Sequence, residues 1–376
     1  MLQILTRKDY VRVKPLASGL RDQSMALAVL EGTRPGIALV NDKVAPSALF
    51  IAASEGSFTW TYLAGDSSDR TFQLDLNQWL FDDHWLGSDI TFSFLVYDDA
   101  SWEPALATIL HPRAVIPDRR LLLACTERPE SWRSAIPDGY SIRSIDQDLL
   151  NSGVQIPEKV SQWLDHNFGS RAAFLDRGFG AAAVCDDQVV AWCLADSVVG
   201  DRADIGVETD EAHQRKGLAY CTTCMTLEQA FDRGLRQIGW HCHFINIPSV
   251  KTAEKVGFSL QREYRAYAVH FDVEEHANIA NVIGVEFITQ ATEALERGAC
   301  QESNDLLERM FGFCTPQKAA AYILAARAAA GCDESDVAFE RLASAVKRGW
   351  SPTTDANAHP ELVSLQADSR WLDLVS

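Results

Sequence analysis

The chain has 376 residues, a formal net charge of −18 and a hydrophobic content of 47%. This length predicts two or three domains of ordinary size, and the composition is that of a globular protein rather than a disordered one. The excess of acidic residues argues against nucleic-acid and anionic-membrane binding, because both depend on clustered Lys and Arg. It favours cationic small molecules or basic peptides as partners.

The start of the chain, "MLQILTRKDYVRVKPL", lacks the long apolar core and the small-residue cleavage site of a signal peptide. No run reaches the ~20 apolar residues that a membrane span requires. The nine Cys stand at irregular spacings in a long chain, which predicts reduced thiols. These features together predict a cytoplasmic protein.

The first 130 residues predict an α/β region. Ser101 is expected to be the N-cap of a helix over 101–110. The stretch 126–139, with two prolines and mixed charge, is a candidate linker. The expected strands are 35–42, 47–54, 58–65, 90–99 and 118–125, and a further helix is expected at 74–87.

A second α/β region is expected over 131–275, and a helical region over 276–376. The helical region is rich in Ala and Leu with helical periodicity, which predicts paired helical hairpins. Asp186-Asp187-Gln188 predicts a hairpin turn. The expected strands are 140–145, 180–187, 188–199, 202–209, 236–244 and 262–271, and the expected helices lie near 157–174, 217–235 and 248–256.

The loop "DEAHQRKGLA" joins the expected strand 202–209 to the helix that follows it. A helix N-terminus exposes unpaired N–H groups and binds anions readily. Gly217 leaves room for a ligand to approach the backbone, and Arg215 and Lys216 add positive charge. The loop predicts a pyrophosphate site; an ordinary strand-to-helix turn with a solvated basic patch is the alternative.

Two motifs in this region resemble the GNAT N-acetyltransferase superfamily. Gln214-Arg215-Lys216-Gly217-Leu218-Ala219 is similar to its Q/R-x-x-G-x-G/A acetyl-CoA loop. About thirty residues later, Asn246 and a helix ending in Gly257-Phe258 resemble its second signature. The resemblance implies a GNAT fold of class α/β (α+β), with a mixed, mostly antiparallel sheet flanked by helices.

The resemblance extends to a bacterial tandem-GNAT-like subfamily. It implies a degenerate GNAT-like lobe at 1–130 without the loop motif, a catalytic GNAT domain at 131–275 and an all-α, tetratricopeptide-like helical domain at 276–376. The helical domain would bind a protein partner or mediate self-association, or it would be a stabilising appendage.

Acetyl-CoA is the cosubstrate that the resemblance implies. The backbone N–H groups from Arg215 to Ala219 would hold its pyrophosphate, and strands 202–209 and 236–244 would splay apart to admit the thioester. The implied cosubstrate-binding residues are Val207, Thr209, Gln214, Arg215, Lys216, Gly217, Leu218, Ala219, Asn246 and Ser249.

Acetyl transfer to an amine requires a neutral amine, so a base must remove a proton. Glu208, on the strand beside the slot, is the first candidate, and His241 and His243 are the second. Ala253 stands where many GNAT enzymes carry a Tyr that protonates the leaving thiolate. Tyr264 or Tyr267 would substitute for it, or the thiolate leaves unprotonated.

Cysteines 221 and 224, with the nearby His241 and His243, also have the residue types of a zinc site. Core packing is favoured, because both Cys fall on one expected helix, and no metal is predicted.

The sequence therefore predicts an acetyl-CoA-dependent N-acetyltransferase that acts on a primary amine of a small cationic molecule, with antibiotic resistance or detoxification as its role. Direct transfer in a ternary complex is expected. The alternative is a catalytically weak CoA-binding adaptor that recruits a protein through its helical domain.

Overall fold

The computed structural model describes residues 2–55, 58–81, 90–113, 115–244, 246–311, 316, 318–352 and 359–375. The chain forms two compact units, Met1–Asp272 and Val273–Ser376. Among the described residues, no helix is both long and apolar enough to cross a membrane.

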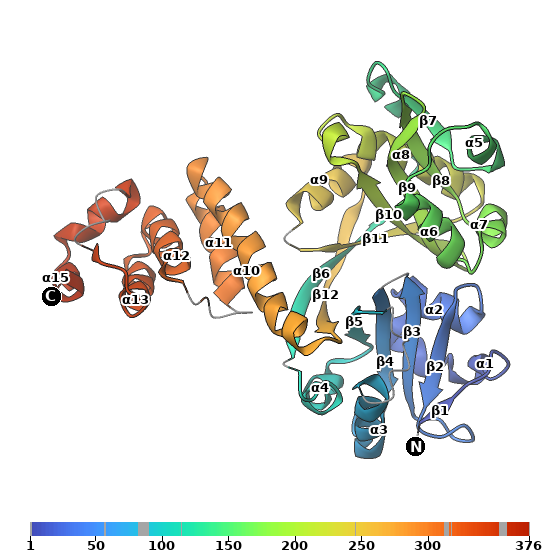
Figure 1. Ribbon diagram of the computed structural model, residues 1–376, viewed down its shortest axis with the longest axis horizontal. Helices are drawn as coiled ribbons and strands as arrows, with labels where there is room; N and C mark the ends of the chain where they lie inside the picture. Colours follow the sequence, from blue (N-terminus) through green and yellow to red (C-terminus); the bar gives the residue numbers. More distant parts are fainter. Residues whose placement is uncertain are drawn as a thin grey trace. The chain divides into compact units, whose positions relative to one another are not determined.

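The first unit is built on one sheet of twelve described strands, in the order β1-β2-β3-β4-β5-β12-β6-β11-β10-β9-β8-β7 (Figure 1). The strands of its first half are β1 (Gln3–Ile4), β2 (Gly36–Val40), β3 (Ala48–Glu55), β4 (Phe58–Gly65), β5 (Phe92–Tyr97) and β6 (Ile116–Cys125). The strands of its second half are β7 (Ser141–Ser144), β8 (Gly180–Cys185), β9 (Gln188–Val199), β10 (Arg202–Thr209), β11 (Gln237–His243) and β12 (Ser259–His270).

The first six strands in the chain and the last six are arranged in the same order, and each set places its last strand beside the other set. Each half contains one parallel pair, β4 with β5 and β10 with β11, and the other pairs are antiparallel. β6, from the first half, pairs with β11, whereas β12, from the second half, pairs with β5. The exchanged strands run side by side between the halves (Figure 1). Because of this exchange, the halves share one continuous sheet.

The stretch predicted to be a linker is packed against the second half. It contains the short 3-10 helix η3 (Trp132–Ala135), and the Trp132 side chain is buried. Its indole N–H donates to Glu228 on α8 (Leu218–Asp232) at 3.0 Å. The proline and charge pattern of this stretch therefore marks a surface connection rather than a hinge.

Helices cover the sheet, and two of the local predictions about them are wrong. The single helix expected over 157–174 is two helices, because Ser170 starts a new one by accepting from the Ala173 N–H at 3.2 Å. The carboxylate of Asp99, not Ser101, caps the segment that leads into α4. The helix predicted at 74–87 is described up to Phe81, and its last residues lie outside the described ones.

The helices not yet given are α1 (Tyr10–Val13), η1 (Leu16–Leu20), α2 (Ser24–Glu31), α3 (Arg70–Phe81), η2 (Ala100–Trp102), α4 (Glu103–Ile109), α5 (Gln147–Asn151), α6 (Glu158–His166), α7 (Arg171–Arg177), η4 (Glu211–His213) and α9 (Ile247–Val256).

The predicted hairpin between β8 and β9 is confirmed. Asp186 and Asp187 have φ of 47° and 56°, the left-handed conformation that a two-residue turn of type I′ requires. Asp tolerates this conformation better than most residues, so the Asp pair explains the turn.

The second unit is helical throughout its described part. Gly298 and Gly349, with φ of 76° and 88°, each follow the end of a helix and allow the chain to turn back. A buried cluster that includes Trp350 and Trp371 packs the later helices together. The elements are α10 (Val273–Glu296), α11 (Cys300–Phe311), α12 (Ala319–Gly331), α13 (Ser335–Val346), η6 (Pro360–Ala367) and α15 (Arg370–Val375). The likeness to tetratricopeptide repeats stays a prediction.

Candidate active site

Strands β10 and β11 splay apart, as the family resemblance implies. They pair over three positions, from Arg202↔Gln237 to Asp204↔Gly239. At that point β9 carries an extra residue, Asp196, because Asp204 lies opposite Ser197 and Ile205 lies opposite Ala195. Beyond this bulge, the edge of β10 that faces β11 has no strand partner in the described part of the chain. The free edge can pair with an extended ligand.

The loop after β10 has the backbone of an anion-binding site. Arg215 has φ of 60° and Gly217 has φ of 83°, and α8 begins at the next residue. Left-handed residues in such a turn aim neighbouring N–H groups into one concavity, and the helix N-terminus adds further unpaired donors. A Cβ placed on Gly217 would meet nothing within 4 Å, so open space lies above the loop.

Three cavities adjoin along this edge of the sheet. We call the loop over 210–219, which follows β10, the phosphate loop. The outer cleft, about 560 Å³ in volume, lies between this loop, the end of β10 and α9. The slot, about 310 Å³, lies between the splayed strands and is lined by Gly206, Trp240 and His241 among others. The inner cleft, about 360 Å³, lies between β4 and α6. We use these three names below.

The cavities share walls. Val207, Trp240, Asn246 and Ser249 line both the outer cleft and the slot. Trp163 lines both the slot and the inner cleft. Glu208 lines both the outer and the inner cleft, so it stands where a molecule in one would meet a molecule in the other.

The cosubstrate-binding residues predicted from the sequence gather at the outer cleft, with one exception. The Lys216 side chain is absent from its lining; the ammonium donates instead to the Tyr140 hydroxyl at 2.9 Å. The Gln214 amide donates to the Thr209 carbonyl at 3.2 Å and so holds the loop against the end of β10. The Thr209 hydroxyl is buried without a hydrogen-bond partner among the described residues, as expected of a group that contacts a ligand. The predicted residues on the lining are Val207, Thr209, Gln214, Arg215, Gly217, Leu218, Ala219, Asn246 and Ser249.

Asn246 is the N-cap of α9. Its side-chain oxygen accepts from the Ser249 N–H at 3.1 Å, and the Ser249 hydroxyl accepts from the Trp240 indole N–H at 3.0 Å. The cap thereby fixes the start of α9 against β11, at the wall shared by the outer cleft and the slot.

We expect Asn246→Ala to lower the free energy of unfolding of the first unit by about 1 kcal/mol, because it removes this cap. Asn246→Ser is the matched control, since Ser is also a good capping residue. Urea denaturation and acetyl-CoA titration of both variants separate the two roles. If the Ser variant binds acetyl-CoA as wild type does, the side chain serves the cap alone.

Glu208, the first candidate for the base, is half-exposed and paired. Its carboxylate accepts from the Lys159 ammonium at 2.5 Å, and that hydrogen bond raises the pKa of Lys159. Both side chains are open to solvent, so the pair is weak and an incoming ammonium can compete with Lys159.

His241 and His243 share the slot face of β11, as the strand period predicts. His241 is hydrogen-bonded on one side, where its Nδ1 lies 2.8 Å from the Tyr264 hydroxyl. Its Nε2 has no hydrogen-bond partner among the described residues and lies 3.5 Å from a carboxylate oxygen of Asp204. His243 Nε2 lies 2.5 Å from the buried carboxylate of Asp118. A carboxylate thus stands beside each ring, behind the slot.

Tyr264 lies behind His241 and lines none of the three cavities. Burial raises the pKa of Tyr264 to about 12, so the hydroxyl stays protonated at neutral pH and shares a hydrogen bond with Nδ1 of His241. Tyr264 therefore acts through His241 rather than on a ligand. Tyr267 packs against Tyr97 in another core cluster and also lines none of the three cavities. The position of Ala253 is buried in α9.

Several lining residues could not be found by motif. Tyr220, Lys251 and Lys255 line the outer cleft, where the Lys255 ammonium lies 4.9 Å from the centre of the Tyr220 ring. The two lysines stand four residues apart on α9, so they lie on one face of the helix that follows Asn246. This spacing is the sequence feature that could have predicted them as lining residues. Trp163 and Lys159 lie on a helix with no motif at all.

The cysteine pair belongs to the core. Cys221 and Cys224 are fully buried in α8, and burial raises the pKa of Cys224 to about 12. Within the described ranges, no group of three or more His, Cys, Asp or Glu side chains is arranged to hold a metal ion.

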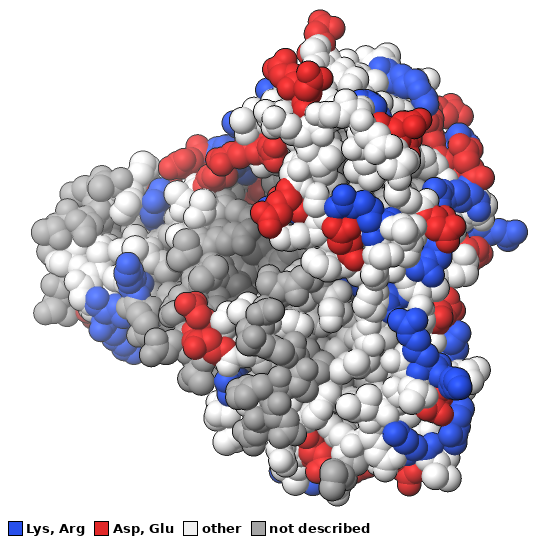
Figure 2. Space-filling view, turned by 45° about the vertical axis from the view of Figure 1, so that its right-hand side comes forward, with Lys and Arg blue, Asp and Glu red and all other residues white. Residues whose placement is uncertain are grey.

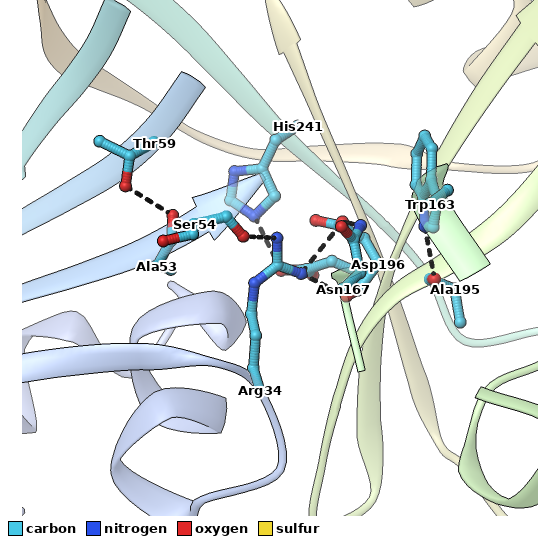
Figure 3. Close-up of polar contacts among 10 residues, drawn as sticks. Arg34, Ala53, Ser54, Thr59, Trp163, Asn167, Ala195, Asp196 and His241 are labelled. Carbon is cyan, nitrogen blue, oxygen red and sulfur yellow. Dashed lines mark hydrogen bonds and ion pairs between the residues drawn. The ribbon is translucent and has the colours of Figure 1, made fainter. Parts of the chain in front are cut away.

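A buried ion pair joins the two halves of the first unit beside the site. The guanidinium of Arg34, from the loop after α2, donates to the carbonyl of Asp196 at 2.6 Å and lies 3.3 Å from its carboxylate (Figure 3). It also donates to the Ser54 carbonyl at 3.3 Å, and the Asn167 amide donates to Asp196 at 2.7 Å. The bulge in β9 is therefore held by groups from both halves.

The net negative charge does not form a single acidic patch on the face drawn in Figure 2. Acidic and basic side chains are interspersed there.

Comparisons with a family model and with known proteins find similar chains. A sequence model of the GNAT acetyltransferase family matches residues 14–267. An uncharacterized N-acetyltransferase of Bacillus subtilis (strain 168), YdfB, is 25% identical over 269 residues, which cover 71% of this chain and 98% of that protein. A GCN5-related N-acetyltransferase-like protein from Streptococcus suis 89/1591 superposes with a TM-score of 0.53 at 22% identity, over 69% of this chain and 98% of that one. A tandem GNAT protein from the clavulanic acid biosynthesis pathway matches with a TM-score of 0.47 at 11% identity, over 72% of this chain and 99% of that one.

The family match spans more than half of the sequence, and the splayed strands and phosphate loop lie within it. The chain belongs to the GNAT acetyltransferase family. The second unit, from Val273 onward, lies outside the matched residues.

Proposed function

We propose that this protein transfers an acetyl group from acetyl-CoA to a primary amine of a small cationic molecule, with both substrates bound at once. The shared wall of the two clefts carries the proposal: Glu208 lines both the outer and the inner cleft. Each cleft has the volume of a small-molecule site. The roles in resistance or detoxification and the protein-binding or self-associating role of the second unit stay predictions.

Acetyl-CoA would occupy the outer cleft and the slot. The N–H groups from Arg215 to Ala219 would hold its pyrophosphate, and the unpaired edge of β10 from Val207 to Thr209 would pair with its pantetheine arm. The left-handed backbone of the loop and the unpartnered Thr209 hydroxyl support this placement. Lys251 and Lys255 offer positive charge for the remaining phosphate.

The acceptor amine would enter by the inner cleft. Its ammonium would displace Lys159 from Glu208 and give up one proton there, and the neutral nitrogen would attack the thioester carbonyl. The new C–N bond forms as the C–S bond breaks. His241 or His243, which line the slot, would take the second proton of the attacking nitrogen and pass it to the CoA thiolate, and Glu208 would release the first proton to solvent. The Tyr264 hydroxyl, hydrogen-bonded to His241, would orient that ring.

Calorimetric titration with acetyl-CoA tests the proposal. We expect Gly217→Glu to weaken binding about tenfold or more, because it places a carboxylate and a strained left-handed residue at the pyrophosphate site. Gly234→Glu is the matched control: Gly234, at the other end of α8, has φ of 82° and equally open surroundings, but it lines none of the cavities. If both variants bind as wild type does, the loop is only a turn.

A thiol-release assay with a panel of amines then decides between catalysis and binding. Release of free CoA in step with an acetylated amine would support the transferase. Binding of acetyl-CoA without release across the panel would favour the adaptor.

A further inference from the structure

The inner cleft is walled by aromatic rings from both halves of the first unit. Phe58 and Trp60 come from β4, and Trp163 comes from α6. The rings of Phe58 and Trp60 meet edge to face, with centroids 6.5 Å apart, and Trp60 stacks on Phe94 behind it at 4.8 Å. This wall is thus built on packed strand residues.

Trp163 is held in one orientation at the boundary with the slot. Its indole N–H donates to the Ala195 carbonyl at 3.0 Å (Figure 3). The ring also lies against the backbone of Gly206: a Cβ on that glycine would be 2.2 Å from the tip of the ring. A ligand that reaches the thioester from the inner cleft must therefore pass a fixed aromatic edge.

The described lining of the inner cleft carries little charge for binding a polycation. Among the described residues that line it, Glu208 is the one carboxylate, and it is already matched by the ammonium of Lys159. The remaining polar groups that face the cleft include Gln162 and His166, which add no negative charge. A molecule with several ammonium groups would bury or crowd charges here without partners, which is costly.

We infer that the acceptor is a monoamine with an aromatic or similarly apolar body, and not a polyamine or an aminoglycoside. This inference rests on the proposed function and narrows its substrate class. The single ammonium would replace Lys159 at Glu208, and the apolar body would lie against Phe58, Trp60 and Trp163.

The test compares binding of two probes, phenethylamine and spermidine, by calorimetry with CoA present at saturation. We expect phenethylamine to bind about tenfold tighter or more, with a negative heat-capacity change from burial of its ring. Phe58→Ala should remove most of this preference, whereas Phe58→Leu, which keeps an apolar side chain, should retain part of it. Equal or tighter binding of spermidine, or no saturable binding of phenethylamine, would overturn the inference.

A second variant adds charge on the exposed face of α6, where it replaces the hydrogen bond from the Gln162 amide to Glu158, 3.0 Å long, with a like-charge contact that destabilises the helix only slightly. Gln162 is exposed on α6 and lines the cleft, so Gln162→Glu supplies the second carboxylate that a polyamine needs. We expect it to tighten spermidine about threefold and to leave phenethylamine almost unchanged, as for an exposed charge pair. Gln147→Glu, on exposed α5 away from the cavities, is the control and should shift neither probe.

The two proposals fail in different ways. Acetylation of spermidine in preference to phenethylamine would leave the transferase standing and remove the narrower substrate class. Tight phenethylamine binding with no thiol release from any amine would leave the cleft assignment standing and remove the transferase.

Discussion

Replacing Glu208 with Gln should lower kcat/KM for the acceptor amine by about 10²- to 10⁴-fold, the range for loss of a general base. The amide keeps the size of the side chain but cannot take a proton. The affinity for acetyl-CoA should not change, because the phosphate loop and the edge of β10 are intact. Steady-state kinetics and calorimetry on the same preparation measure both quantities.

Glu263→Gln is the matched control for this variant. Glu263 is also a half-exposed strand glutamate in an ion pair, with Arg119, and it lines none of the three cavities. It should keep full activity, which separates loss of a base from loss of a surface salt bridge. If Glu208→Gln retains wild-type turnover on an acetylated acceptor, Glu208 is not the base, and His241 becomes the group to test.

Replacing Arg34 with Met should destabilise the first unit by about 3–5 kcal/mol, because it leaves the buried carboxylate of Asp196 without its cation. The side chains of Arg34 and Asp196 are 1% and 7% exposed, so water cannot take over this role. Chemical denaturation, followed by tryptophan fluorescence, measures the loss.

Two further variants show where this loss comes from. Arg128→Met breaks the solvent-exposed pair with Asp232 and should change stability little. Adding Asp196→Asn to Arg34→Met should recover a large part of the stability, because the uncompensated charge is then gone. If the Arg34 and Arg128 variants lose the same small amount, the buried pair is not what joins the halves.

Local features of the site could be predicted from the sequence because they depend on residues close together in the chain. The phosphate loop combines the end of a strand, the left-handed Gly217 and the start of a helix within a few residues, and each has a local signal. The same holds for the Asp186-Asp187 turn and for the strand register that places His241 and His243 on one face.

The sequence predictions for the cap before α4 and for the helix over 157–174 were wrong, because more than one interpretation fitted the local pattern. Ser101 and Asp99 are both good capping residues two positions apart, and only the backbone geometry selects Asp99. The break between α6 and α7 was missed because apolar residues recur on both sides of it, although Ser170 was a visible start signal.

The sequence by itself predicted strands β2 to β12, the left-handed glycine in the loop after β10 and the family resemblance, because hydrophobic period, turn residues and short motifs act over a few positions. Only the tertiary structure decided which strand lies beside which. The exchange of β6 and β12, the Lys159 contact on Glu208 and the position of Tyr264 behind His241 all follow from that packing. The inner cleft also follows from that packing, because Trp60 and Trp163, about a hundred residues apart in the chain, both line it. Such contacts depend on shape and burial between distant segments, which no local pattern records.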